Sequence, residues 1–219
     1  IKALEYTIET TNATVASGKA VTLDLNGQTI IMSNTSVTNN GTLTIAGTSG
    51  TLTGSGASTI TNNGTLVKNT AAEIANTSTA TYSVIENNGT ATISAGKVTS
   101  SYIGLNNKAN GKLNITGGAI SATQSGVLVS AGTVSMTAGT VTSTSGAGIS
   151  ATVGSVTVTG GTVTGKTYGI YTSGTSKPNV TLGTNDGKIS ITSPAITAST
   201  GTGVEVVSGA IFNFYDGVI

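Results

Sequence analysis

Eight carboxylates are the side chains in this sequence that could form the acid and base pair of a glycosidase. The chain has no histidine and no cysteine, and its nine basic side chains are all lysines. A glycosidase needs two carboxylates that face each other, and a nucleophile triad needs a base such as histidine. The eight acids are scattered along the chain: Asp24, Asp186, Asp216, Glu5, Glu9, Glu73, Glu86 and Glu205. We therefore expect solvated charges, no cofactor, and a protein that is not an enzyme.

One short segment contains residue types that calcium accepts as ligands. Asn185 and Asp186 are followed directly by Gly187, and calcium prefers carboxylate and carbonyl oxygens. One carboxylate is a thin ligand set, and Asp-Gly is a common turn dipeptide. The sequence favours a turn here and predicts no metal site, with calcium as the alternative.

Three tyrosines have the chemistry to contact a glycan, because an aromatic ring stacks on the apolar face of a sugar ring. Tyr102, Tyr168 and Tyr171 lie at or beside glycine turns in different parts of the chain. Packing in a turn or in the core is the alternative role. We keep all three as candidate glycan contacts, although three coils would separate Tyr102 from Tyr168 by about 14 Å.

Paired asparagines recur before glycine and predict a structural ladder. The second asparagine of each pair is Asn40, Asn63 or Asn88, at steps of 23 and 25 residues. Stacked side-chain amides hydrogen-bond along such a ladder, and asparagine tolerates the left-handed turn. A row of amides that contacts a glycan is the functional alternative.

The elements that position these residues follow from a repeat of about 22 residues. Each copy has the form apolar-x-apolar, then glycine, then another apolar residue, as in Val134, Met136, Gly139 and Val141. The alternation has period 2, which is typical of strands. We expect the first apolar positions to stack in one buried column: Leu23, Leu43, Leu66, Ala91, Leu113, Val134, Val156, Ile189 and Phe212.

This repeat predicts an all-β fold, a right-handed parallel β-helix of about nine coils with three short strands each. We expect a single domain over residues 1–219, with residues 1–20 as an N-terminal capping segment and residues 173–188 as a loop insertion. The last copy stops at its third apolar position, Ile219, which predicts an incomplete C-terminal coil. Open strand edges there would permit self-association through the coil ends.

Charge and hydropathy exclude several kinds of partner. The formal net charge is +1, and the lysines are spread over different copies, which argues against nucleic acid. The sequence contains no run of 18 apolar residues, so we expect no membrane span in this chain. Outward threonine rows suggest ice binding as an alternative, but Val67, Lys112 and Asn114 interrupt them.

Three segments carry a resemblance to a known family. Val21–Ile30, Thr159–Tyr171 and Phe212–Ile219 resemble the pectate-lyase-like right-handed β-helix regions of large Gram-positive surface proteins and adhesins. The resemblance implies an extracellular location on the cell surface, in a Gram-positive cell wall. The enzymatic members of this family carry Asp, Arg and His clusters across neighbouring coils. This sequence lacks Arg and His, so the resemblance does not imply catalysis.

These observations predict a non-catalytic extracellular structural or adhesive β-solenoid, part of a longer bacterial surface protein or fibre. Its expected partner is a glycan or a protein of the host or bacterial surface. Two alternatives remain open: a carbohydrate-binding module on a β-helix, and a subunit of an extracellular filament stacked end to end.

Overall fold

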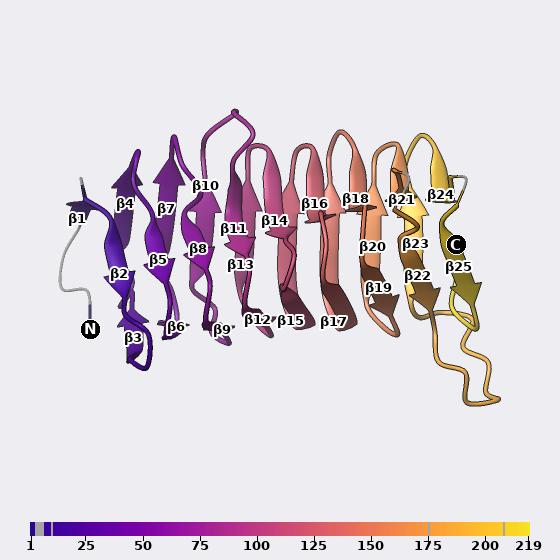
Figure 1. The fold of residues 1–219 in the computed structure, drawn as a ribbon, viewed down its shortest axis with the longest axis horizontal. Coiled ribbons are helices and arrows are strands. Elements are labelled where there is room, and N and C mark those ends of the chain that lie inside the picture. Colours follow the sequence, from indigo (N-terminus) through magenta and orange to yellow (C-terminus); the bar gives the residue numbers. More distant parts are fainter. Residues whose placement is uncertain (3–6, 10, 175, 208) are drawn as a thin grey trace.

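The computed structural model describes residues 1–2, 7–9, 11–174, 176–207 and 209–219. Every regular element in these residues is a strand, and every strand pairing is parallel. The chain winds from one end of an elongated body to the other, with the termini at opposite ends (Figure 1). The fold is therefore a parallel β-solenoid, as the repeat predicts.

The first face of the solenoid contains the apolar-x-apolar segments. Its strands are β3 (Ala20–Asp24), β6 (Thr42–Ala46), β9 (Thr65–Lys68), β12 (Thr90–Ile93), β15 (Lys112–Ala122), β17 (Thr133–Ser143), β19 (Ser155–Val158), β22 (Asn179–Leu182) and β25 (Ile211–Phe214). In the inner coils their side chains alternate between buried and partly exposed, as in β6 and β19. Period-2 burial is what the threonine-rich alternation predicts.

The second face follows the glycine turn of each coil. Its strands are β1 (Thr7–Glu9), β4 (Thr29–Ser33), β7 (Thr51–Ser55), β10 (Glu73–Asn76), β13 (Lys97–Ser100), β20 (Thr162–Gly165) and β23 (Ala195–Ala198). The long strands β15 and β17 run through the corner and contribute to both faces, which joins these faces into one 16-stranded sheet.

The third face is a separate nine-stranded sheet. Its strands are β2 (Ala13–Val15), β5 (Val37–Asn39), β8 (Ile60–Asn62), β11 (Ser83–Asn87), β14 (Ile103–Asn107), β16 (Ser125–Val129), β18 (Ala147–Ala151), β21 (Tyr168–Thr172) and β24 (Thr202–Glu205). Nine levels joined in sequence make about eight turns of about 22 residues. The nine predicted copies therefore correspond to nine levels and about eight complete turns.

Strand register defines the buried column on the first face. Its members, in order along the axis, are Val21, Leu43, Leu66, Ala91, Leu113, Val134, Val156, Val180 and Phe212. The members from Leu43 to Val180 are at most 2% exposed. Each inward side chain thus packs on its counterparts above and below, which stabilises a fold with few charged residues.

Two members of the predicted column were wrong. Leu23 pairs with Ile45, one inward position further along the strand, so Val21 takes its place. Ile189 is 83% exposed, and Val180 holds the eighth position. Val180 lies 24 residues after Val156 and Ile189 lies 33 after it, so only Val180 is reached by a coil of ordinary length. Local alternation alone could not separate two candidates with the same pattern.

Because Val180 and not Ile189 holds the eighth position, the insertion also lies later in the chain than predicted. Within residues 173–188, the segment Asn179–Leu182 is strand β22 and pairs with β19 and β25. The projecting loop instead joins β22 to β23, over residues 183–194, and extends away from the body beside β25 (Figure 1). The insertion therefore interrupts the eighth coil after its first strand.

The N-terminal segment adds a rung to both sheets. β1 pairs with β4 and β2 pairs with β5, while the backbone of Ile1 bonds to Thr22 and Asp24 of β3. Part of the predicted cap, including Glu5, lies outside the described residues. At the other end, β25 and the residues after it expose apolar side chains: Ile211, Phe214, Tyr215, Val218 and Ile219.

Candidate functional site

Two of the three candidate tyrosines form a stacked pair on the outer surface of the nine-stranded sheet. Tyr168 and Tyr171 both belong to β21, and their ring centroids are 4.7 Å apart with an interplanar angle of 23°. Both side chains are partly exposed. The pair is possible because Gly169 and Ile170, between them, are both buried, so the tyrosines three residues apart share the outer surface. Offset stacking of this kind fixes both rings.

A hollow of about 210 Å³ lies against this pair. The strand beside β21 is β18, and it places Ala147 next to Tyr168 and Ser150 next to Tyr171. These short side chains leave a depression between β21 and β16, two levels away. The hollow is lined by uncharged residues only: Gln124, Ser125, Gly146, Ala147, Ser150, Thr167, Tyr168 and Tyr171.

Tyr102 lies apart from the stacked pair. It precedes β14, and its carbonyl accepts a hydrogen bond from the backbone of Gln124 at 2.8 Å. Because Ile103 aligns with Ser125, Ala147 and then Tyr168, Tyr102 lies three coils before Tyr168. The structure brings Tyr168 and Tyr171 together and leaves Tyr102 about 14 Å away along the axis.

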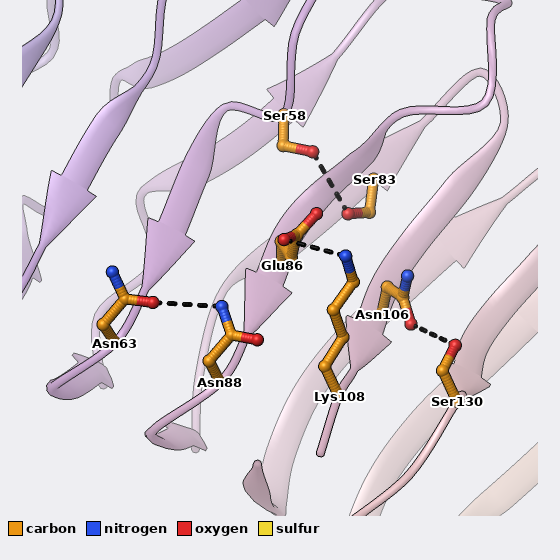
Figure 2. A network of polar contacts seen from close by, with 8 residues as sticks. All are labelled: Ser58, Asn63, Ser83, Glu86, Asn88, Asn106, Lys108 and Ser130. Atoms are coloured by element: carbon orange, nitrogen blue, oxygen red, sulfur yellow. Dashed lines mark hydrogen bonds and ion pairs between the residues drawn. The ribbon is translucent and has the colours of Figure 1, made fainter. Parts of the chain in front are cut away.

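The predicted asparagine positions lie in an exposed row at the corner after the nine-stranded sheet. The amide of Asn63 donates to Asn40 at 2.9 Å. The amide of Asn88 donates to Asn63 at 3.0 Å, as Figure 2 shows. The glycine that follows each pair is required by close packing, since a Cβ on Gly64 would lie 2.1 Å from the Gly41 carbonyl. The row therefore joins three successive coils through side-chain amides.

A second asparagine row lies inside the solenoid, and sequence reasoning did not separate it from the outer one. Asn39, Asn62, Asn87 and Asn107 are completely buried, and their side chains are linked in series at 2.7, 2.7 and 2.8 Å. Each amide also donates to backbone carbonyls at the corner. Among the described residues, no buried side-chain nitrogen or oxygen lacks a partner. The inner row thus satisfies the polar groups of a corner that faces the core.

Sequence reasoning also missed a buried lysine. Lys68 aligns with Ile45 and Ile93 on the first face and has no solvent exposure. Its ammonium donates to the Thr70 carbonyl, and to the Ala95 carbonyl at 3.1 Å. Burial lowers the pKa of Lys68 from 10.5 to about 8, with an opposing effect of the Glu73 carboxylate. The sequence did contain a signal: the third copy has Leu66 at its first inward position but a lysine, Lys68, at its second, where most other copies have an apolar residue.

The carboxylates are distributed over the whole body. Asp24 accepts a hydrogen bond from the backbone of Asn26 near one end, and Asp216 accepts one from Thr184 near the other. Glu86 forms an ion pair with Lys108 at 2.9 Å on the outer sheet surface (Figure 2). Within the described parts of the chain, no three His, Cys, Asp or Glu side chains come together as metal ligands would.

The segment proposed for calcium has the hydrogen bonds of a turn. The backbone of Asp186 donates to the Thr184 carbonyl at 2.9 Å, and the Asp186 carboxylate accepts from the backbone of Lys188 at 2.9 Å. Gly187 supplies the positive φ of 75° that the turn requires. Asn185 and Asp186 are both exposed. Local backbone groups therefore already use this carboxylate.

Other polar contacts also connect neighbouring coils. Ser58 and Ser83 are 3.4 Å apart, and Ser130 donates to Asn106 at 2.8 Å (Figure 2).

Within the described residues, no helix is long and apolar enough to cross a membrane. Comparisons of the chain with protein-family models, curated proteins and solved structures give no match.

Proposed function

We propose that this chain is a non-catalytic structural and adhesive solenoid, part of an extracellular bacterial surface protein. The observation that carries the proposal is the continuity of the strand pairing, because the first face is paired from β3 to β25 and the third from β2 to β24. Stacked parallel strands resist bending and stretching, since every coil is bonded to the next along its length. Such a body suits a spacer that holds a binding surface away from a cell.

The composition of the surface supports an extracellular role. Only 8% of the residues are charged, and outward positions on the strands are mostly threonine, serine and asparagine. Neutral hydroxyl and amide groups hydrate the surface without strong dependence on salt. The resemblance to the β-helix regions of Gram-positive surface proteins and adhesins supports the same location.

The distribution of acids supports a role without catalysis. Asp24 and Asp216 lie near opposite ends of the solenoid, and Glu86 is held by Lys108. A glycosidase needs its two carboxyl groups about 5–10 Å apart. The purified chain should release no products from polygalacturonate, alginate or mixed host glycans. Product release that one carboxylate substitution abolishes would overturn this part of the proposal.

A labelling experiment tests the location. Antibodies raised against the chain should label intact cells that produce it naturally, without permeabilisation. Digestion of intact cells with a broad-specificity protease should remove the label, while a cytoplasmic marker protein stays intact. A signal that needs permeabilised cells would place the protein inside the cell and would contradict the proposal.

A pulling experiment tests the mechanical role. The chain, held between its ends in a force spectrometer, should unfold in steps of one or more coils. One coil of about 22 residues releases about 70 Å of extended chain. Smooth extension without discrete steps would show that the coils offer no mechanical resistance, and the spacer role would then be wrong.

A further inference from the structure

The hollow beside Tyr168 and Tyr171 has the shape and chemistry of a ligand subsite. On this sheet, β18 places the short side chain of Ala147 beside Tyr168 and that of Ser150 beside Tyr171. Tyr168 and Tyr171 line one side of the hollow, and Gln124 and Ser125, two levels away, line the other. Because adjacent strands are about 4.8 Å apart, the two walls are roughly 10 Å apart. The result is a slot one level wide that runs along β18.

The groups that line the slot are of two kinds. The tyrosine pair presents apolar ring surface, while Gln124, Ser150 and Thr167 present amide and hydroxyl groups. Gln124 and Thr167 are exposed, so their side chains are free to turn toward a ligand. A ligand that matches both kinds has C–H groups on one side and hydroxyl groups around its edge.

We infer that this slot binds a neutral saccharide, one sugar ring at a time. A sugar ring has C–H groups that pack on tyrosine, and its hydroxyl groups pair with the amide and hydroxyl side chains. None of the eight lining residues is charged, which disfavours an acidic sugar. A hollow of about 210 Å³ is smaller than the roughly 300–1,000 Å³ pockets of drug-sized ligands. It therefore suits a single ring of a longer chain that continues over the surface.

The stacked pair gives this subsite rigidity. The two rings are in contact at 4.7 Å, so binding does not have to order two separate flexible side chains.

A peptide is a less suitable occupant. The backbone groups of β16, β18 and β21 pair with one another, and no strand edge is open to a peptide at this level.

The test is a titration of the whole isotope-labelled chain, followed by the amide signals of β16, β18 and β21. The probes are the neutral oligosaccharides cellohexaose, chitohexaose, maltohexaose and mannohexaose, with trigalacturonate as an acidic sugar and a proline-rich decapeptide as a peptide. We expect at least one neutral sugar to shift these amides at millimolar concentration or below. The acidic sugar and the peptide should leave the same amides unchanged.

Variants assign the binding to the slot. The double variant Tyr168→Ala and Tyr171→Ala should bind the responsive sugar about tenfold more weakly, because ring contact is lost. Ser150→Tyr should weaken binding by filling the slot while it keeps both rings. Tyr82→Ala is the matched control, since Tyr82 is 38% exposed on the loop between β10 and β11. This control should bind as the parent chain does.

Three results would overturn the inference. The first is that no neutral sugar shifts the amides of the slot, and the second is that Ser150→Tyr and the double variant bind as tightly as the parent chain. The third is a stronger response of the same amides to the decapeptide or to trigalacturonate. Unchanged amide signals from β17 in each variant would show that the solenoid is intact, so a loss of binding reports on the slot.

Discussion

Replacement of Lys68 by methionine should stabilise the protein at neutral pH. Lys68 occupies an inward position between Ile45 and Ile93 and has no solvent exposure. Among the described residues, its ammonium donates hydrogen bonds to two carbonyls, those of Thr70 and Ala95. Methionine has a similar length, is apolar and is flexible enough to fill the same space. The substitution therefore removes a buried charge without leaving a large cavity.

The size of the effect follows from the lowered pKa. A pKa reduced from 10.5 to about 8 means that the charged form costs the folded state about 3 kcal/mol relative to the neutral form. The substitution also removes the donor of two carbonyls, at a cost of about 1 kcal/mol each. The net expectation for Lys68→Met at pH 7 is a gain of about 1 kcal/mol. Buried ionic groups replaced by apolar ones commonly give gains of this order.

The dependence on pH gives a sharper test than the value at pH 7. The folded pKa of Lys68 is lower than the unfolded one, so the unfolded chain binds more protons between about pH 8 and 10.5. The stability of the parent chain should therefore rise across this window by up to about 3 kcal/mol. Below pH 8 both states are protonated, and Lys68 adds no slope.

The measurement is the free energy of unfolding in urea at pH 7, 9 and 10.5, approached from both the folded and the unfolded side. Lys97→Met is the matched control, because Lys97 is an exposed lysine on β13. The control should keep the slope of the parent chain between pH 8 and 10.5, whereas Lys68→Met should lose it. Equal slopes for the parent and Lys68→Met, or a loss of more than about 2 kcal/mol at pH 7, would refute the reasoning.

Four further substitutions have expected effects on the same urea assay. Asn62→Leu should cost about 2–4 kcal/mol, because it leaves buried amides of the inner row without partners, whereas Asn63→Ala in the exposed row should cost less than about 1 kcal/mol. Gly96→Ala should cost more than about 2 kcal/mol, since its Cβ would lie 2.3 Å from the Thr70 carbonyl oxygen and the residue has a φ of 72°. Leu113→Asp should prevent folding, and a cooperative transition in that variant would contradict the buried column.

The strands could be predicted from the sequence because their pattern is local. Val134 and Met136 alternate with outward hydroxyl residues, and the structure buries both of them on β17. The pattern fails where two candidates look alike. Val180 and Ile189 both begin an apolar-x-apolar segment, and only the length of a coil, a property of the stacked structure, decides between them.

The candidate site was partly predictable. The sequence shows which residues are tyrosines and that they lie near glycine turns. It also shows that Tyr168 and Tyr171 are close to each other in the chain. The hollow was not visible, because it depends on what lies one level away. Ala147 and Ser150 are unremarkable small residues on a strand, and they matter only because register places them beside the tyrosines.

The two asparagine rows show why a polar residue at an inward position is compatible with this fold. In a solenoid, the neighbours of an inward side chain are the residues at the same position one coil above and one below. Asn62 therefore donates to Asn87 and accepts from Asn39, while the row ends at Asn107, whose amide donates to three backbone carbonyls. A buried asparagine amide has its hydrogen-bond partners when the adjacent coil also has an asparagine at that position, or when backbone carbonyls at the corner accept its hydrogen bonds. Lys68 meets the same requirement through carbonyls alone, but with a charge, and for that reason we expect it to be the position where an apolar substitution increases stability.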